Sequence, residues 1–243
     1  MDLDITITAC RRPEILTKTL TSFYFNMLLK NYDCEVSINI DPVGTGTESK
    51  TLDACALFFP DFGCRAPEEP NFSKAFKWVW QHRMGADYVL HLEDDWELLK
   101  KVDLMDMVDI LENNPKLALL RLPQFKADGD RMKNWNKFFP WNGEYFECPE
   151  ELKMSVGFCG HPSLIKREFI ENTVNFIDTT KNPEKQFHRG PKEIMEEVAK
   201  WSYGVYGTPK QSAMIRDIGR RWMVENKWKK KGSKAYFMEW EKS

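Results

Sequence analysis

Apolar and polar positions along the first half of the chain follow two periods, which predict alternating strands and helices. Between residues 3 and 9, apolar residues alternate with Asp and Thr, as in a half-buried strand. Runs of β-branched and aliphatic residues predict three further strands, at 36–40, 88–92 and 116–122. Apolar residues three or four positions apart predict helices between the strands, at 13–27, 52–59, 71–83 and 103–113.

The resulting order of elements, β-α-β-α-α-β-α-β, predicts an α/β fold. Strands that alternate with helices form a mainly parallel sheet with helices on both faces. Residues 123–243 are less regular, with helices expected at 167–173 and 191–201 and mostly loops at 125–149. No internal repeat or low-complexity segment is visible. We therefore expect a single domain over 1–243, in which a regular half (1–122) precedes an irregular one (123–243).

Composition and charge narrow the classes of function. The chain has 243 residues, enough for a sizeable core, and its 42% hydrophobic and 30% charged residues are globular values. A formal net charge of −2 predicts neither a polyanion binder nor a membrane-surface protein. Residues 220–234 are locally basic, because Glu225 is the only acid among them. Their basic residues are Arg220, Arg221, Lys227, Lys229, Lys230, Lys231 and Lys234. Charge alone leaves two readings of this segment open: phosphate binding, or a solvated helix face.

Cysteine spacing and the N-terminal residues bear on the cellular location. The six cysteines show neither a CxxC pair nor zinc-ligand spacing, and most lie among apolar residues. We expect reduced thiols that pack as small hydrophobic groups. The N-terminus is unlike a signal peptide, and no apolar run is long enough to span a bilayer. The expected location is the cytoplasm, with no membrane span.

Three consecutive carboxylates, Glu93, Asp94 and Asp95, directly follow the strand expected at 88–92. Carboxylates this close repel one another unless a cation or hydrogen-bond donors offset their charge. In an open α/β sheet, ligands bind beyond the carboxyl ends of the strands. Because hard divalent cations take oxygen ligands and bridge diphosphates, the cluster predicts a Mn²⁺ or Mg²⁺ site. The alternative is a cap for the segment beginning at Trp96, for which one acid would suffice.

Together these features resemble the GT-A glycosyltransferases, particularly the family-2-like and N-acetylglucosaminyltransferase-I-like members. The resemblance rests on the first strand running into Thr-Ala-Cys-Arg-Arg-Pro at 8–13, on a second strand ending at Asp41, and on Leu-His-Leu-Glu-Asp-Asp-Trp at 90–96 after the helix 71–83. It covers the first half well, and the second half only through scattered glycines and acids. It implies a GT-A (Rossmann-like) fold, with nucleotide-sugar binding by 1–122 and acceptor binding by 123–243.

The resemblance implies that the nucleoside is held by the loop after the first strand and by the acid that ends the second. Thr8 and Arg11 belong to that loop, and Asp41 is that acid. A carboxylate accepts the N3–H of uracil, which favours a UDP-sugar. Lys74, near a helix N-terminus, would reach the diphosphate. The alternatives are that Asp41 is a turn acid before Pro42 and that Lys74 is an ordinary solvent-facing lysine.

The same resemblance divides the roles within the acid cluster. The last acid of the family motif is the direct metal ligand, which implies that role for Asp95. Glu93 would face the ribose or a metal-bound water. Asp94 would face the hydroxyls of the donor sugar.

In the second half, the resemblance is carried by a glycine-bearing segment and a late acid. Gly157 would lie beneath the donor sugar, where the backbone must approach a ligand closely. The family often supplies a late histidine as another metal ligand, but no histidine follows His188. Asp217 is expected to take its place, and Arg220 or Arg221 is expected to clamp the diphosphate.

Inverting transfer also needs a base for the proton of the acceptor hydroxyl. The family supplies it near the start of a helix in the second half, which makes Glu193, Glu196 and Glu197 candidates. Glu193 and Glu197 share a helix face, and Glu196 is expected nearer the buried stripe. A solvated acidic face is the alternative for each of them. His161 either touches a sugar or phosphate or is simply structural.

These observations favour a metal-dependent glycosyltransferase (hexosyl- or pentosyltransferase) that moves a sugar from a UDP-sugar to a hydroxyl group. A sugar-phosphate nucleotidyltransferase is disfavoured because no glycine follows the first strand. A non-catalytic nucleotide-sugar-binding module is disfavoured because packed acids gain nothing without a cation. Trp135, Trp141 and the basic segment leave two acceptors open: a saccharide, or a hydroxymethylated base in DNA, as for a phage-type DNA-modification enzyme in the host cytoplasm.

Overall fold

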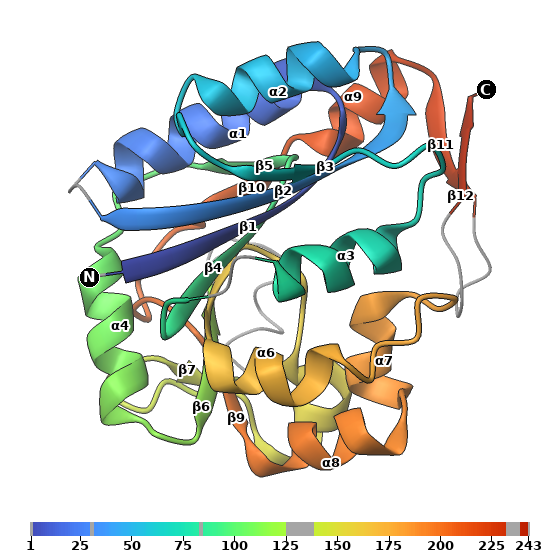
Figure 1. The fold of residues 1–243 in the computed structure, drawn as a ribbon. Helices are drawn as coiled ribbons and strands as arrows, with labels where there is room; N and C mark the ends of the chain where they lie inside the picture. The colour runs from blue at the N-terminus through green and yellow to red at the C-terminus, as the bar shows by residue number, and fades with distance from the viewer. Residues whose placement is uncertain (1, 30–31, 83–84, 125–138, 232–238, 243) are drawn as a thin grey trace.

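An eight-stranded sheet with the order β3-β2-β1-β4-β8-β6-β9-β7 forms the centre of the protein (Figure 1). The computed structural model describes residues 2–29, 32–82, 85–124, 139–231 and 239–242. The strands of this sheet are β1 (Asp2–Arg11), β2 (Asp33–Gly44), β3 (Gly63–Arg65), β4 (Tyr88–Glu93), β6 (Leu117–Arg121), β7 (Phe146–Glu147), β8 (Ser163–Lys166) and β9 (Ser202–Val205).

The sheet is mainly parallel, as the order of elements predicts. β1 pairs in parallel with β2 and β4, β2 with β3, and β6 with β9. β8 lies between β4 and β6 and is antiparallel to both, so β4 and β6 run in the same direction. β7 is antiparallel to β9. The strands predicted at 3–9, 36–40, 88–92 and 116–122 are confirmed as β1, β2, β4 and β6. β3, β8 and β9 were not expected, and β7 lies in the segment expected to be mostly loops.

The helices of the first half begin at residues whose side chains or rings favour a helix start. α1 (Pro13–Phe23) has Pro13 in its first turn and runs into a π-helical turn (Tyr24–Leu28). α2 (Glu48–Ala56) starts before the predicted 52–59, because the Thr47 side chain accepts a hydrogen bond from the Lys50 backbone. Asn71 caps α3 (Phe72–Gln81) as expected, and Asp103 caps α4 (Leu104–Asn113).

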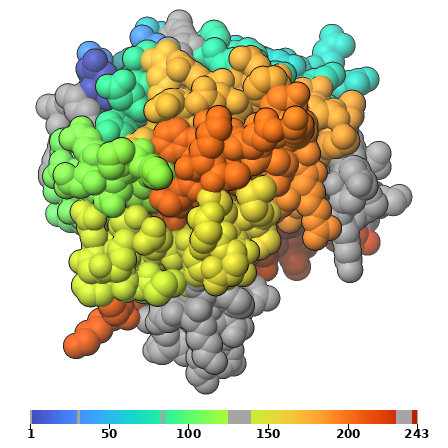
Figure 2. All heavy atoms as spheres, turned by 90° about the horizontal axis from the view of Figure 1, so that it is seen from below, coloured from blue at the N-terminus to red at the C-terminus, as the bar shows by residue number. Residues whose placement is uncertain are grey.

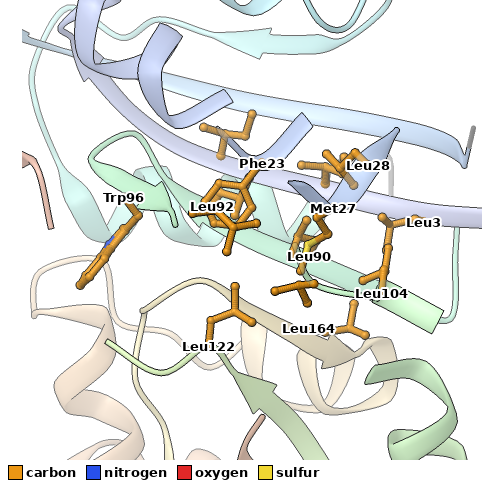
Figure 3. Packing of buried hydrophobic residues seen from close by; sticks show 14 of the residues in the cluster. Leu3, Phe23, Met27, Leu28, Leu90, Leu92, Trp96, Leu104, Leu122 and Leu164 are labelled. Carbon is orange, nitrogen blue, oxygen red and sulfur yellow. The ribbon is translucent and has the colours of Figure 1, made fainter. Parts of the chain in front are cut away.

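Helices cover both faces of the sheet, and each face has its own apolar core. α1, α2 and α4 pack with Leu3, Leu90 and their neighbours into one cluster. Figure 3 shows Phe23 and Met27 of the first helical segment meeting Leu90 and Leu92 of β4 in this cluster. α3, α6 (Arg167–Val174), α7 (Pro183–Arg189) and α8 (Lys192–Lys200) contribute to a second cluster on the other face. Both faces of β4 are therefore buried.

The second half adds two small ribbons to the sheet and helices. β5 (Trp96–Leu98) pairs antiparallel with β10 (Ile215–Asp217), and α9 (Gly219–Glu225) follows β10. β11 (Trp228–Lys231) and β12 (Glu239–Lys242) pair antiparallel, and β11 packs against α9 (Figure 1). The helices predicted at 167–173 and 191–201 are confirmed as α6 and α8. Most of the loop predicted at 125–149, including Trp135, lies outside the described residues, as does Lys234.

All six cysteines are free thiols; Cys55 and Cys148 are buried, and Cys64 is exposed. In the described part of the chain, no helix combines the length and apolar character needed to cross a bilayer.

Candidate functional site

A cavity of about 350 Å³ opens at the carboxyl ends of β1 and β4. Seven of the residues expected at the site line it, namely Thr8, Asp41, Glu93, Asp94, Asp95, Asp217 and Arg220. Its walls also include Arg12, His161, Glu184 and Trp240. Residues of both halves of the chain therefore meet at this edge of the sheet.

The pairing of three parallel strands brings the first group of polar residues together. Thr8 of β1 lies opposite Glu93 of β4, and Cys10 of β1 lies opposite Asp41 of β2. The Thr8 hydroxyl is buried and, within the described residues, has no hydrogen-bond partner. A buried hydroxyl of this kind normally finds a partner, so a ligand in the cavity would supply one.

Asp41 lies near the end of β2, and two hydrogen bonds hold its carboxylate. Its Oδ1 accepts a hydrogen bond from the Asn39 side chain at 2.9 Å, and its Oδ2 accepts one from the Asn71 backbone at 3.1 Å. Burial raises the pKa of Asp41, and these two hydrogen bonds oppose that shift. The sequence left open whether Asp41 is merely a turn acid; its carboxylate faces the cavity and is oriented by polar partners from two elements.

Asp94 lies in the wall of the cavity and pairs with Arg12. The Arg12 Nε donates to Asp94 Oδ2 at 3.1 Å, the Arg12 Nη2 donates to Oδ1, and the Cys10 backbone donates to Oδ2 at 2.9 Å. Both side chains are buried, and burial raises the pKa of Asp94 while Arg12 opposes the shift. The guanidinium carbon of Arg12 also lies 5.2 Å from the ring centre of Trp222. The carboxylate of Asp94 therefore serves as the ion-pair partner of Arg12.

Asp95 and Asp217, the two expected metal ligands, are brought to the same place by the β5–β10 ribbon. Asp217 lies opposite Trp96, and the Ile218 backbone donates to the Asp95 carbonyl at 2.9 Å. Each carboxylate has an arginine partner: Arg12 Nη2 lies 3.2 Å from Asp95 Oδ2, and Arg220 Nε lies 2.8 Å from Asp217 Oδ2. The second oxygen of Asp217 accepts hydrogen bonds from the first backbone N–H groups of α9.

Gly219 is the residue that allows α9 to approach Asp95. A Cβ atom at this position would lie 2.2 Å from Asp95 Oδ2 and 2.8 Å from its Cγ. Any side chain there would displace the carboxylate. The start of α9 therefore requires glycine for the acid pair to form.

The donor chemistry of the cavity suits a small, hard cation that arrives with a diphosphate. Asp95 and Asp217 offer oxygen ligands, but among the described residues no group of three or more His, Cys, Asp or Glu side chains is arranged to hold an ion. Mg²⁺-type sites in nucleotide enzymes use one or two carboxylates and take further oxygens from phosphates and water. The residues present fit that type of site.

Four of the other expected residues lie away from the cavity lining or have other contacts. Arg11 pairs with Glu48 at 3.4 Å, and Arg221 pairs with Glu225 at 2.7 Å. The Lys74 side chain is exposed on α3. Gly157 packs against an aromatic side chain, since a Cβ atom there would lie 2.7 Å from Cδ2 of Tyr203.

The three glutamates expected to include the base lie on α8, which packs against α6 and α7 and does not line the cavity. Figure 2 shows the face of the molecule on which α8 (orange) lies at the surface. Glu193 and Glu196 are exposed. The expectation that Glu196 lies nearest the buried stripe is wrong: Glu197 is buried, because the Asn172 side chain and the Trp201 indole N–H donate to it at 2.9 and 2.8 Å.

Glu184, which is not among the residues expected from the sequence, lines the cavity from the first turn of α7. Asn182 caps this helix and Pro183 begins it, so Asn182-Pro183-Glu184 is a helix-start signal that periodicity alone did not reveal. Glu184 Oε1 accepts a hydrogen bond from the Gly160 backbone at 2.6 Å. This contact anchors one carboxylate oxygen at the cavity wall.

His161 lies beside Glu184 in the same wall. Its ring centre is 4.7 Å from that of Trp96. Burial lowers the pKa of His161 to about 4, so the imidazole is neutral near pH 7. A neutral imidazole can donate and accept a hydrogen bond at once.

Comparison with solved structures identifies the architecture. S. aureus TarS aligns over 89% of this chain and 36% of its own, with 11% identity and a TM-score of 0.60. TarS residues 1–349 in complex with UDP-GlcNAc align over 88% and 57%, with 10% identity and a TM-score of 0.58. The mannosyltransferase PcManGT from Pyrobaculum calidifontis, in complex with GDP-Man and Mn²⁺, aligns over 85% and 54%, with 15% identity and a TM-score of 0.56.

These likenesses show that the chain has the GT-A fold, as the sequence resemblance implied. The chain spans between about a third and six tenths of the length of these solved chains. No protein-family model matches it, and no curated protein matches its sequence.

Proposed function

We propose that this protein is a metal-dependent glycosyltransferase that moves a sugar from a nucleotide-sugar, preferentially a UDP-sugar, to a hydroxyl group. The observation that carries the proposal is the meeting of Asp41, Asp95 and Asp217 in one cavity at the carboxyl ends of β1 and β4. Bound UDP-GlcNAc in one structural neighbour, and GDP-Man with Mn²⁺ in another, support the class of donor and the need for a metal.

Asp41 is the residue we assign to the nucleobase. Its carboxylate is fixed by Asn39 and Asn71 and lines the cavity. A fixed acceptor suits the N3–H of uracil, whereas cytosine has no hydrogen at N3. Thr8, whose buried hydroxyl has no partner among the described residues, would bond the nucleoside from the neighbouring strand.

Asp95 and Asp217 are the residues that would hold the metal, which supplies positive charge to the leaving diphosphate. Arg12 and Arg220, which pair with these acids, place two permanent cations at the same wall. Guanidinium groups bind phosphate through paired hydrogen bonds. The protein's own arginines would therefore also bind the diphosphate and stabilise the charge that develops on it.

Glu184 is the best-placed base for the acceptor hydroxyl. Its Oε1 is held by the Gly160 backbone, which leaves Oε2 to accept a proton. It lines the same cavity as Asp95, whereas Glu193, Glu196 and Glu197 do not. We therefore transfer the role expected of those three residues to Glu184.

The proposal is tested by thermal unfolding with UDP, GDP, CMP or dTDP, each with and without Mn²⁺. UDP with Mn²⁺ should raise the unfolding temperature, because a ligand that binds only the native state stabilises it. The shift should disappear in Asp95→Ala and persist in Asp109→Ala, which removes an exposed carboxylate from α4. A shift that ignores both the metal and Asp95→Ala would refute the role of the acids.

A further inference from the structure

A second cavity, of about 400 Å³, lies next to the first and shares His161 with it. Phe139 and Phe158 contribute apolar surface, and Arg121, Lys185 and His188 contribute polar groups. Aromatic and aliphatic walls with a few polar groups are typical of sites for small molecules. None of the roles assigned above uses this cavity.

The two cavities differ in the sign of their charge. Several carboxylates line the first, whereas none of the described residues that line the second is an acid. Arg121 and Lys185 supply positive charge to the second cavity, and among the described residues neither forms an ion pair. Arg121 is half-buried and Lys185 is exposed at the rim. Cations without an ion-pair partner beside a largely apolar cavity favour an anionic ligand.

Arg121 is held in position at the carboxyl end of β6. Its Nη1 donates to the Val156 carbonyl at 3.2 Å, and its guanidinium carbon lies 4.8 Å from the ring centre of Phe139. These contacts fix the plane of the guanidinium and leave its other N–H groups for a ligand. A fixed guanidinium pairs well with the two oxygens of a phosphate or carboxylate.

The imidazole rings of the two histidines that line this cavity are neutral near pH 7. Burial lowers the pKa of His161 to about 4 and lowers the pKa of His188. His188 Nε2 lies 3.0 Å from the Phe158 carbonyl, which can only accept, so this nitrogen carries the hydrogen. The Nδ1 of His188 is then an acceptor suited to a hydroxyl group.

We infer that the second cavity binds the acceptor and that the acceptor is a small anion, a sugar or polyol bearing a phosphate or carboxylate group. The assignment as acceptor rests on the proposed function; the preference for an anion does not. Glu184 and Lys185 are consecutive on α7 and line the first and second cavities respectively. An acceptor bound to Arg121 and Lys185 through its anionic group therefore presents its hydroxyls towards His161 and the proposed base.

The inference is tested by calorimetric titration of the full chain with glucose 6-phosphate, glucuronate and glucose. Glucose 6-phosphate should bind at least about tenfold more tightly than glucose, because charge-assisted hydrogen bonds are the stronger class. Arg121→Gln and Lys185→Gln should each lower the affinity for glucose 6-phosphate about tenfold and leave the affinity for glucose unchanged. Comparison with glucuronate separates a phosphate from a carboxylate preference.

Two matched controls locate the anion. Arg220→Gln removes an arginine of the first cavity, and Lys192→Gln removes an exposed lysine of α8 that pairs with Glu196. Neither should change the affinity for glucose 6-phosphate by more than about twofold. Arg121→Lys, which keeps the charge, should recover part of the binding, and circular dichroism checks that every variant is folded.

Equal affinities for glucose and glucose 6-phosphate would overturn the inference. It would also be overturned if Arg220→Gln lowered the affinity for glucose 6-phosphate as much as Arg121→Gln does. Tighter binding of a single-stranded oligonucleotide, lost in the same two variants, would overturn the assignment to a small molecule in favour of nucleic acid. Anion binding that depends on Arg121, in a protein that shows no response to UDP and Mn²⁺, would refute the glycosyltransferase proposal while the anion site stands.

Discussion

The guanidinium of Arg12 and the carboxylate of Asp94 form a buried, two-point ion pair in the wall of the cavity; each residue is 2% exposed. Arg12 reaches from this pair to Asp95 at 3.2 Å, and the Thr19 hydroxyl donates to the Asp94 carbonyl at 2.7 Å. One arginine thus links the loop after β1 to the acids after β4. The pair fixes where Asp95 lies.

Asp94→Asn should lower the free energy of unfolding by about 3–5 kcal/mol, because it leaves Arg12 charged, buried and without a full partner. Urea denaturation measures the loss. Glu225→Gln breaks the exposed Arg221–Glu225 pair instead and should cost less than about 1 kcal/mol. Similar losses in the two variants would contradict the importance of the buried pair.

Gly219→Ala should reduce metal-dependent binding of UDP at least about tenfold while the fold is retained, because the new methyl group displaces the Asp95 carboxylate. Titration of UDP with and without Mn²⁺ gives the ratio. Gly85→Ala is the matched control, since a Cβ atom there meets nothing within 4 Å. Unchanged UDP binding in Gly219→Ala would mean that Asp95 does not take part.

Acidification should destabilise the protein partly through His91, which is fully buried on β4. The Trp80 indole N–H lies 3.3 Å from His91 Nδ1, and burial lowers the pKa of His91 to about 3. The unfolded chain, with a histidine pKa of about 6.5, binds the proton that the native state refuses. The contribution is therefore complete above about pH 6.5 and is lost as the pH falls towards about 3.

Urea denaturation at several pH values compares the wild-type chain with His91→Gln. The variant should lose less stability than the wild type between about pH 6.5 and pH 4, because glutamine does not titrate. The comparison also cancels the buried carboxyl groups, such as Asp41, that both proteins share. Parallel curves would show that the pKa of His91 is the same in the native and unfolded states.

Glu184→Gln should lower the rate of sugar transfer by about 10²–10⁴-fold and leave the thermal shift with UDP and Mn²⁺ intact. The substitution removes the proposed base but none of the residues proposed to bind the nucleotide-sugar. Release of UDP from a panel of UDP-sugars, with glucose 6-phosphate as acceptor, measures the rate. Glu193→Gln and Glu196→Gln on the exposed face of α8 should retain the wild-type rate. If either of these falls instead, the base lies on α8.

Periodicity predicted the strands that are long or buried, because neighbouring residues along the chain carry that signal. β8 was not predicted because it has only four residues, and its place in the sheet depends on pairing with β4 and β6 on either side. The sequence placed the acids near the carboxyl ends of strands: Asp95 follows β4, whereas Asp41 lies inside β2, which continues to Gly44 rather than ending at Asp41 as predicted. These are properties that a local stretch of chain determines.

The choice between neighbouring residues could not be predicted in the same way. Arg11 and Arg12 are adjacent and alike, but Arg12 meets the buried Asp94, whereas Arg11 pairs with Glu48. Glu197 rather than Glu196 is buried because Asn172 and Trp201 supply donors. Such outcomes depend on partner residues from elements that are distant in the sequence. The hydrophobic periodicity of a single helix does not predict those partners.

The β5–β10 ribbon joins Asp95 to Asp217, two residues about half the chain apart. During synthesis the first carboxylate is made long before the second, so the acid pair cannot exist until β10 has emerged and docked. A growing or truncated chain that ends before β10 contains Thr8 and Asp41 but lacks Asp217. If Asp95 and Asp217 hold a metal as proposed, the site can form only after β10 has been synthesised and has paired with β5.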